Sequence, residues 1–339
     1  MRHKTDGTIQ KDLDDGIDTT GKKMTVCQLY AKQIRHRGNV RYNTKNGRKR
    51  LMKLLEEDKL GGCPIDSVKL SDAKEWAIRM KEKGISYKTI SNDKRSLKAA
   101  FYTAIQDDCI RKNPFDFQLN TVIEDDTEPK VSLTPAQEES FLSFAQNDKV
   151  YQKYYDELII LLGTGLRISE LCGLTDTDID FENRIINVDH QLLRSAETGY
   201  YIETPKTKSG IRQIPMSEKV YEAFNRVLKR RRGAKAVTID GYSNFLFLNR
   251  DGYPKTATNY DGMFRGLAKK YNKYHEEALP KVMTPHTLRH TFCANMANAG
   301  MNPKALQYIM GHSNITMTLN YYAHATFDSA KAEMLRIAA

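Results

Sequence analysis

A set of basic and phenolic side chains is spread along the C-terminal two-thirds of the chain. These are Arg167 in GTGLRISEL, Lys206 in TPKTKSGIRQIP, His286 and Arg289 in TPHTLRH, His312 in MGHSN, and Tyr321 and Tyr322 in TLNYYAH. Guanidinium, ammonium and imidazole groups neutralise negative charge, and arginine binds phosphate oxygens through two parallel hydrogen bonds. A phenol becomes a nucleophile where cationic neighbours lower its pKa. The set favours chemistry on a phosphodiester by the protein's own cations, and no sequence motif resembles a divalent-metal site.

Each of these residues also has a simpler structural explanation. Arg167 follows two glycines where one helix is expected to end and another to begin, so it could cap a helix or pair with Glu170. The Thr-Pro dipeptide before His286 is typical of a helix start. It places His286 and Arg289 three residues apart on one helical face, where both could meet one phosphate. A His-x-x-Arg pair alone is weak evidence, because surface helices often carry one.

The lysines, the loop histidine and the tyrosines are equally ambiguous when taken singly. Lys206 and Lys208 lie on an expected turn, where lysines are usually solvated, although a mobile turn could deliver an ammonium group that protonates a leaving oxygen. Lys208 is the alternative to Lys206 in that role. His312 follows a probable helix-terminating glycine and could be structural, and Tyr321 and Tyr322 could be core aromatics. The functional interpretation is favoured only when these residues are considered together as a set.

Composition points to a polyanionic partner. The chain has 339 residues, with 53 Lys+Arg against 42 Asp+Glu, a net charge of +11 and a pI near 9.2. Nucleic acid is the commonest partner of so basic a protein. Five scattered cysteines without a C-x-x-C pair indicate reduced thiols, and neither a secretory signal nor a membrane-spanning stretch is found. We expect a cytoplasmic protein.

The first third of the chain predicts a small helical domain. Residues 1–23 are polar and aperiodic and are expected to form a flexible lead-in. Residues 24–114 place apolar residues at three- and four-residue spacing, as amphipathic helices do. The polar faces of these helices are strongly basic. The density of basic residues favours contact with DNA over the simpler explanation of a solvated charged face. The residues expected to contact DNA are Arg41, Lys45, Arg48, Lys49, Lys88, Lys94 and Arg95, together with Lys208 and Arg212 further along the chain.

The remainder predicts a linker and a mixed α/β domain. Residues 115–132 are acidic and turn-rich and are expected to link the two domains. Residues 133–324 should form the second domain, with short strands at 184–191, 199–206 and 211–216. The last two strands are expected to flank the KTKSG turn as a hairpin carrying Lys206. Helices are expected at about 217–231, 259–273, 286–299, 304–310 and 315–323, and an amphipathic tail helix at 325–339.

The ordered set of motifs resembles the tyrosine recombinase, or phage-type integrase, family. The order is R-x-S-E-L, a lysine in a β-hairpin, H-x-L-R-H, G-H-S and Y-x-H. In the first domain, a Gly-Gly turn, a G-x-S-x-x-T-I helix start and a closing Arg-Lys-Asn-Pro are also similar to that family. The likeness extends from Met24 to Ala339 and is nearest to integrases of Gram-positive conjugative transposons. It implies an all-α, SAM-like core-DNA-binding domain and a mixed α/β catalytic domain that form a C-shaped clamp on DNA.

The resemblance also implies a mechanism that needs no metal, nucleotide or other cofactor. Tyr322 would attack the scissile phosphate and form a 3′-phosphotyrosyl link, while Arg167 and Arg289 hold the non-bridging oxygens. Lys206 would protonate the leaving 5′-oxygen, His286 would act as acid and base, and His312 would bind the phosphate. Tyr322 has the Y-x-H spacing of the family, whereas Tyr321 has the nine-residue spacing from His312 that some relatives use. Tyr322 is preferred and Tyr321 is the alternative.

The implied role is site-specific recombination that integrates and excises a mobile element. The expected partners are double-stranded DNA, further copies of the chain in a tetrameric synapse, and an excision (directionality) factor. The tail helix would dock on a neighbouring protomer. Many such integrases carry an N-terminal arm-binding domain, for which only a polar stub is present before Met24. The alternatives are a type IB topoisomerase-like enzyme and a catalytically silent DNA-binding or architectural protein of the same fold.

Overall fold

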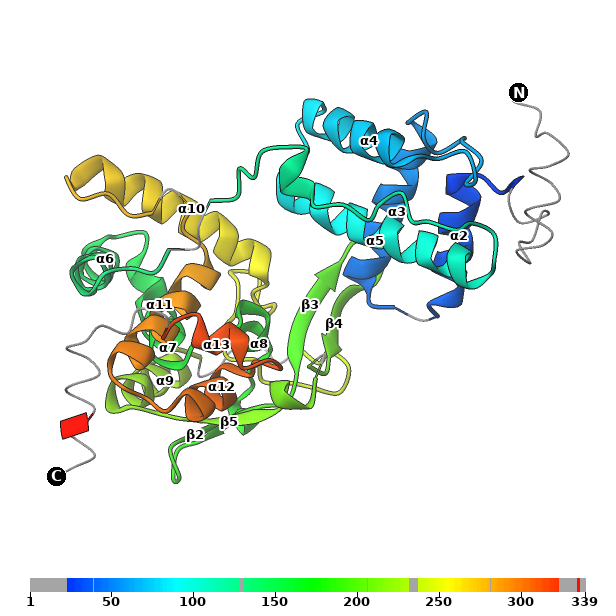
Figure 1. Cartoon of the computed structure of the whole chain (residues 1–339). Helices are drawn as coiled ribbons and strands as arrows, with labels where there is room; N and C mark the ends of the chain where they lie inside the picture. Colours follow the sequence, from blue (N-terminus) through cyan, green and yellow to red (C-terminus); the bar gives the residue numbers. More distant parts are fainter. Residues whose placement is uncertain are drawn as a thin grey trace, which may run out of the picture. The chain divides into compact units, whose positions relative to one another are not determined.

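The chain divides into two compact units, Met1–Pro129 and Lys130–Ala339, in a computed structural model (Figure 1). The structure describes residues 23–38, 40–128, 131–205, 207–231, 237–280, 282–322 and 334–335. The first unit is helical and the second mixes helices with short strands, as the sequence predicts. Most of the expected lead-in and most of the expected tail helix lie outside the described residues.

In the described residues of the first unit, four helices surround one core. They are α2 (Val26–His36), α3 (Tyr42–Glu56), α4 (Leu70–Glu82) and α5 (Tyr87–Gln106). Local signals set their ends: Thr25 and Gln28 form a reciprocal capping box on α2, and the Ser86 hydroxyl accepts from the Thr89 amide to start α5. Trp76 and Phe101 are fully buried and pack against Phe115. The apolar face of each helix is thereby turned toward the same core.

The helical unit extends beyond the predicted boundary at residue 114. Phe115, Leu119 and Ile123 are buried in its core, and a short 3₁₀ helix, η2, spans Leu119–Thr121. The Asn113 side chain donates to the Lys98 carbonyl at 2.8 Å, which ties the segment after α5 back to the middle of that helix. The start of the predicted linker is therefore corrected, because its apolar residues are spaced so that they fold back on α5.

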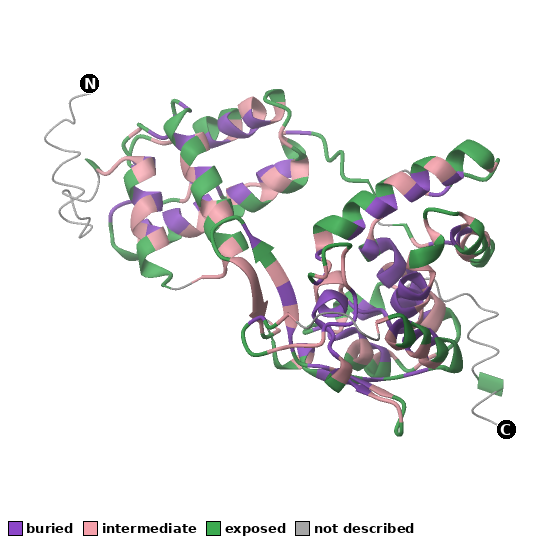
Figure 2. Ribbon diagram, turned by 180° about the vertical axis from the view of Figure 1, so that it is seen from behind, coloured by how far each residue is buried: buried purple, intermediate pink, exposed green. Residues whose placement is uncertain are grey.

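The second unit surrounds a buried helix, α7. Its helices are α6 (Pro135–Asn147), α7 (Tyr155–Thr164), α8 (Ile168–Gly173), α9 (Glu218–Arg231), α10 (Ala257–Tyr274), α11 (Pro285–Asn298), α12 (Pro303–Met310) and α13 (Thr316–Leu319). Leu158, Ile160 and Leu161 are fully buried, and α7 packs against α9 and α11. Figure 2 shows most of α7 in the colour of buried residues. Such an apolar helix needs neighbours on every side.

The strands pair differently from the sequence prediction. They are β1 (Ile179–Asp180), β2 (Ile185–Val188), β3 (Gln191–Ser195), β4 (Gly199–Glu203) and β5 (Arg212–Pro215). One antiparallel sheet has the order β1-β2-β5, and β3 and β4 form a separate hairpin. The tight turn lies at 196–198, closed by Gly199 at φ +70°, a left-handed conformation that glycine adopts readily. The predicted hairpin between 199–206 and 211–216 is wrong, because β4 pairs with β3 and β5 pairs with β2.

The helices expected at 217–231, 259–273, 286–299 and 304–310 begin and end within two residues of their expected positions, but the one expected at 315–323 is shorter, because α13 ends at Leu319 and residues 320–322 form a turn. Thr134 caps α6, Pro135 occupies its first turn, and Gln137 completes a capping box. No helix in the described part of the chain is both long and apolar enough to cross a bilayer.

Candidate active site

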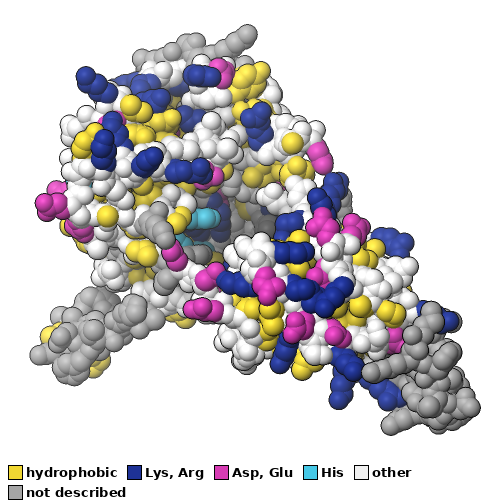
Figure 3. Space-filling view, turned by 90° about the horizontal axis from the view of Figure 1, so that it is seen from above, with side chains coloured by type: hydrophobic (Ala, Val, Ile, Leu, Met, Phe, Trp, Pro, Cys, Tyr) yellow, Lys and Arg dark blue, Asp and Glu magenta, His cyan; other side chains and the backbone are white. Residues whose placement is uncertain are grey.

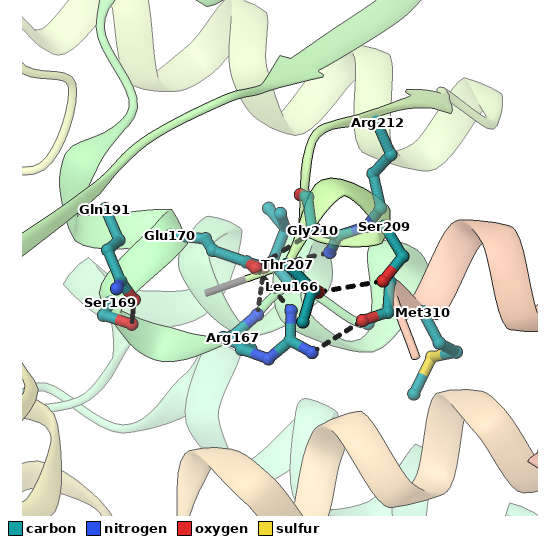
Figure 4. Close-up of polar contacts among 12 residues, drawn as sticks. Leu166, Arg167, Ser169, Glu170, Gln191, Thr207, Ser209, Gly210, Arg212 and Met310 are labelled. Atoms are coloured by element: carbon teal, nitrogen blue, oxygen red, sulfur yellow. Dashed lines mark hydrogen bonds and ion pairs between the residues drawn. The ribbon is translucent and has the colours of Figure 1, made fainter. Parts of the chain in front are cut away.

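The junction between α7 and α8 presents Arg167. Gly165 ends α7 in the left-handed conformation, at φ +62°, and Arg167 is the N-cap residue of α8. The Arg167 guanidinium donates to Glu170 Oε1 at 2.6 Å and to the Gly311 carbonyl at 2.9 Å (Figure 4). Its side chain is still 32% exposed. The capping and ion-pair explanations of Arg167 therefore hold, and they leave part of its side chain exposed.

The second arginine of the set, Arg289, is buried in α11. Its guanidinium donates to the Gly165 carbonyl at 2.5 Å and to the Met310 carbonyl. Burial, followed by the charge of Arg167, lowers the pKa of Arg289 to about 9, so the group stays cationic at neutral pH. Because Met310 and Gly311 are adjacent at the C-terminal end of α12, both guanidiniums converge on carbonyls that carry the partial negative charge of a helix end.

His312 follows Gly311, which ends α12 at φ +61°. The imidazole is buried, and its Nδ1 lies 3.0 Å from the Thr318 hydroxyl of α13. Burial, and then the charges of Arg289 and Arg167, lower the pKa of His312 to about 4. A neutral imidazole beside two guanidiniums can donate a hydrogen bond without adding charge.

The remaining basic candidates that the structure describes, His286 and Lys208, are exposed, unlike Arg289 and His312. His286 lies one turn before Arg289 on α11, but its side chain is exposed where that of Arg289 is buried. Lys206 lies outside the described residues. Lys208 is exposed at the start of a short 3₁₀ helix, η5 (Lys208–Gly210), in the connection between β4 and β5. Lys208 thus lies on a connection between two sheets and not at a hairpin tip.

Both tyrosines are held by hydrogen bonds near the end of α13. The Tyr322 hydroxyl donates to the Met301 carbonyl at 2.5 Å. Burial, then the nearby Cys293 thiol, raises the pKa of Tyr322. The Tyr321 hydroxyl contacts His290 Nδ1, and the two rings stack at 5.7 Å between centroids. A phenol with a raised pKa that donates to a carbonyl is a poor nucleophile, and this describes Tyr322 as it stands in the structure.

Arg212 is not a surface residue, which corrects its prediction as a DNA contact. Its side chain is fully buried on β5 and pairs with Glu170, with Nη2 to Oε2 at 2.9 Å and Nη1 to Oε1 at 3.1 Å. Burial would raise the pKa of Glu170, but Arg212, with Arg167 and Arg289, lowers it to about 2. Glu170 therefore carries a full negative charge among three guanidiniums.

The basic candidates of the helical unit lie on α3 and α5. Lys45, Lys88 and Arg95 are exposed, and the Lys94 ammonium lies 4.4 Å from the centroid of the Phe117 ring. Figure 3 shows Lys and Arg side chains over much of the visible surface, interspersed with carboxylates. Arg41 is the N-cap residue of α3, and Lys45, Arg48 and Lys49 follow within that helix. Lys45, Arg48 and Lys49 also line a groove of about 490 Å³ in this unit.

One group of carboxylate and imidazole side chains has the proximity of a metal site. Ligand atoms of Asp178, Asp189 and His190 lie within 4.8 Å of one another. The protein already occupies these atoms: Asp178 accepts from Thr175, and the two nitrogens of His190 contact Asp189 and the Gly173 carbonyl. The arrangement is explained by hydrogen bonds that join α8 to the sheet.

Sequence reasoning missed the partners that hold the site. Glu170 was considered only as a possible partner of Arg167, and its second arginine, Arg212, was not linked to it. The R-x-x-E spacing of Arg167 and Glu170 predicts their contact, since residues three apart share a helical face. No sequence signal joins Arg212 to Glu170 or Tyr322 to Met301, because these contacts depend on how β5, α8, α11 and α13 pack.

A model of the "Phage integrase family" matches residues 131–329. The transposase from transposon Tn916 of Enterococcus faecalis is 69% identical over 329 residues, which cover 97% of this chain and 81% of that protein. The Tn1549 transposon integrase, solved in complex with a circular intermediate DNA, aligns with a TM-score of 0.89 and 78% identity over 93% of this chain and 99% of that one. A lambda integrase dimer bound to a COC′ core site shares the fold, with a TM-score of 0.62 and 16% identity over 94% of this chain and 81% of that one.

Proposed function

The chain belongs to the phage integrase family, and from this premise we propose that it is a site-specific recombinase. It cuts and rejoins double-stranded DNA to integrate and excise a mobile element. The observation that carries the proposal is the convergence of Arg167 and Arg289 on the C-terminal end of α12, directly before His312. This arrangement forms a compact cationic site for one phosphate. The likeness to a transposon integrase solved on DNA agrees with that use.

The two arginines are proposed to stabilise the charge that develops on the phosphate. Their carbonyl contacts hold the guanidiniums in place before DNA arrives, so little reorganisation is needed at the moment of reaction. Arg167, at 32% exposure, offers the accessible edge, whereas Arg289 lies deeper. Removing one such preorganised donor typically lowers the rate by about 100- to 1000-fold.

His312 is proposed to bind a non-bridging phosphate oxygen as a neutral donor. This role requires the tautomer that carries the proton on Nε2, in which Nδ1 accepts from the Thr318 hydroxyl 3.0 Å away. His286 is proposed as the acid–base partner, since it lies on the exposed side of α11. Lys206 is proposed as the acid that protonates the leaving 5′-oxygen, with Lys208 as the alternative on the same connection.

Tyr322 is proposed as the nucleophile. Its hydroxyl gives its proton to His286, and the phenolic oxygen forms a bond to phosphorus. The bond from phosphorus to the 5′-oxygen breaks, and the leaving oxygen takes a proton from Lys206. The products are a 3′-phosphotyrosyl link and a free 5′-hydroxyl. Because Tyr322 donates to Met301 and has a raised pKa, the segment after α13 must move to bring the phenol to the arginines. Tyr321, held by His290, is the alternative nucleophile.

The deciding experiment uses a nicked suicide duplex that carries the end sequence of the element. Wild type is compared with Tyr322→Phe and Tyr321→Phe on a denaturing gel. We expect a detergent-stable protein–DNA adduct that is lost in Tyr322→Phe and retained in Tyr321→Phe. Loss in Tyr321→Phe alone would keep the reaction and move the nucleophile by one residue. If wild type binds the duplex but never forms an adduct, the chain is a non-cleaving DNA-binding protein.

The working assembly is proposed to be a tetramer on two DNA sites in the cytoplasm, assisted by an excision factor. Exchange of strands needs two duplexes, which separates a recombinase from a topoisomerase-like enzyme. The residues expected to contact DNA outside the catalytic set are Arg41, Lys45, Arg48, Lys49, Lys88, Lys94, Arg95 and Lys208. Mass photometry compares the protein alone with the protein mixed with site-bearing duplexes. We expect a four-protomer species only in the samples that contain DNA.

A further inference from the structure

The Arg212 side chain is buried away from solvent, and each of its three nitrogens donates to a protein acceptor. Its side chain is 0% exposed. Its Nε donates to the Ile309 carbonyl at 2.6 Å, and Nη1 donates to the Gly210 carbonyl at 3.0 Å as well as to Glu170. Nη2 completes the pair with the other oxygen of Glu170. A buried guanidinium with every nitrogen engaged acts on its protein neighbours (Figure 4).

These neighbours belong to three different parts of the active site. Glu170 lies on α8 and also binds Arg167, both through its side chain and through the Arg167 amide at 2.8 Å. Gly210 ends the η5 segment, in the connection that carries the proposed acid. Ile309 lies in the last turn of α12, immediately before the Met310 and Gly311 carbonyls that hold Arg289 and Arg167. One side chain is therefore bonded to the α8, η5 and α12 segments.

The packing around Gly311 tightens this link. A Cβ at Gly311 would lie 3.1 Å from Arg212 Nη1, 3.2 Å from its Cδ, and 3.0 Å from the Ser209 carbonyl oxygen. Arg212 thus fills the space directly beneath the residue that precedes His312. A shift of its guanidinium would be transmitted to His312 on one side and to Glu170 on the other.

We propose that Arg212 is a positioning residue for DNA cleavage, which holds the Arg167 support, the His312 segment and the lysine-bearing connection in register. The inference rests on the proposed recombinase function. Arg212 is distinct from the proposed catalytic residues because it touches neither the phosphate nor the leaving group.

A guanidinium suits this position better than another cation. It presents five N–H donors in a fixed plane, so it can pair side-on with Glu170 and still reach two carbonyls in other directions. Lysine would keep the charge but could not reproduce this geometry. A buried ion pair alone is weak evidence for a stabilising role, since apolar replacements are often neutral. The contacts to Gly210 and Ile309 are what favour a positioning role.

The test compares Arg212→Lys with Arg79→Lys, a matched pair. Arg79 is likewise bound side-on to a carboxylate, Asp58, at 2.7–2.8 Å, but its side chain is 22% exposed and it lies in the helical unit. Single-turnover cleavage of the nicked duplex is measured at saturating protein, together with the Kd for the uncleaved duplex. We expect the saturating cleavage rate to fall at least tenfold in Arg212→Lys, with Kd within about twofold of wild type. In Arg79→Lys the saturating rate should stay close to that of wild type.

A pH profile adds a readout that a purely structural role would not move. Glu170 faces Arg212, Arg167 and Arg289, and these cations keep its pKa low against the effect of burial. In Arg212→Met one cation and its hydrogen bonds are lost, so Glu170 should take up a proton at higher pH and release Arg167. The pH at which cleavage falls off on the acid side should rise by at least one unit. In the double variant Glu170→Gln/Arg212→Met this pH dependence should disappear while the rate stays low.

The outcomes separate the possibilities. A saturating rate in Arg212→Lys equal to that of wild type would overturn the proposal, as would a weaker Kd with an unchanged saturating rate. Circular dichroism checks folding, and if Arg212→Met does not fold, Arg212→Lys, which keeps the buried charge, decides alone. An absence of adduct in wild type would refute the recombinase function itself, so the two failures cannot be confused.

Discussion

At the scale of single residues, His312 illustrates how burial selects a protonation state. The imidazole lies beneath the same two guanidiniums that are proposed to hold the phosphate, so a second proton on the ring is disfavoured both by burial and by repulsion. Its pKa is lowered to about 4. A charged histidine would add positive charge to the site but would destabilise the fold. The neutral ring can donate a hydrogen bond at any pH near neutrality.

This protonation state has a consequence for stability without DNA. Between about pH 6.5 and 4 the unfolded chain binds a proton at His312 that the folded chain does not, so the free energy of unfolding should fall as pH decreases through that window. The full loss is on the order of 3 kcal/mol. His312→Gln removes this contribution. Calorimetric unfolding between pH 6.5 and 5 should show a shallower decline in the variant, and parallel curves would contradict the assignment.

The acid-side behaviour of Glu170 falls in a different window. Its folded pKa is lowered to about 2, so the stability that it contributes is present above its ordinary pKa and is lost only as pH falls toward 2. Unfolding between pH 6.5 and 5 therefore isolates His312 from Glu170.

The residue types of the site could be predicted, and their surroundings could not. Arg167, Arg289 and His312 are recognisable because only certain side chains bind phosphate, and their order in the chain is characteristic. The buried position of Arg212 could not be foreseen, since a basic residue in an alternating strand is equally compatible with a solvated face. The contact of Tyr322 with Met301 joins two segments whose packing no local pattern encodes.

At the scale of elements, the site depends on how helices end. Gly165 closes α7 in the left-handed conformation and turns the chain so that its own carbonyl accepts from Arg289, two residues before Arg167 starts α8. Gly311 does the same for α12 directly before His312. The C-terminal ends of α7 and α12, each closed by a glycine, thus lie together at the site. The sequence motifs GTGLR and MGHS contain these two glycines.

Gly165→Ala should be costly for two reasons. An L-residue at φ +62° is strained, and its Cβ would lie 2.5 Å from Phe292 Cδ1 and 2.9 Å from Met310 Sδ. We expect a loss of about 2–4 kcal/mol in the free energy of unfolding. Gly252→Ala is the matched control, because Gly252 has φ +80° but no atom within 4 Å of a new Cβ. It should cost only about 1 kcal/mol. Equal losses in urea denaturation would show that packing around Gly165 is unimportant.

Helices were easier to predict than strand pairing for a physical reason. The ends of α6, α11 and α12 are marked by Thr-Pro, Thr-Pro and a terminal glycine, which act locally. Strand pairing is decided by distant contacts, and the segments 199–203 and 212–215 both alternate well enough to suggest a hairpin. The structure pairs β4 with β3 across a turn closed by Gly199, a signal that a T-G step between alternating segments could have provided.

At the scale of the whole molecule, charge and catalysis are assigned to different parts of the chain. The described members of the proposed catalytic set come from the second unit, whereas the exposed basic residues of α3 and α5 belong to the first. The net charge of +11 would therefore serve DNA binding as well as solubility, with the helical unit binding the phosphate backbone. Contacts of that kind position DNA and add affinity without reading its sequence.

The salt dependence of DNA binding tests whether the helical unit binds the phosphate backbone while the second unit carries the catalytic residues. Each phosphate contact that is removed should reduce the slope of log K against log salt concentration by about 0.9. We expect Lys45→Gln/Lys88→Gln/Arg95→Gln to flatten the slope by about 2–3 and to weaken specific and unrelated duplexes alike. Fluorescence anisotropy over a series of salt concentrations measures both effects. Saturating single-turnover cleavage should be nearly unchanged, because the phosphate site lies in the second unit.

A charge-matched variant distinguishes local contact from the general field of a basic protein. Lys59→Gln/Lys69→Gln/Lys83→Gln removes the same charge from exposed positions of the same unit that are not expected to meet DNA. If only net charge matters, the two triple variants should lose affinity equally and show the same slope. A steeper slope in the control than in the α3–α5 variant would place the DNA-binding surface on α3 and α5, because counterion release counts contacts and not total charge.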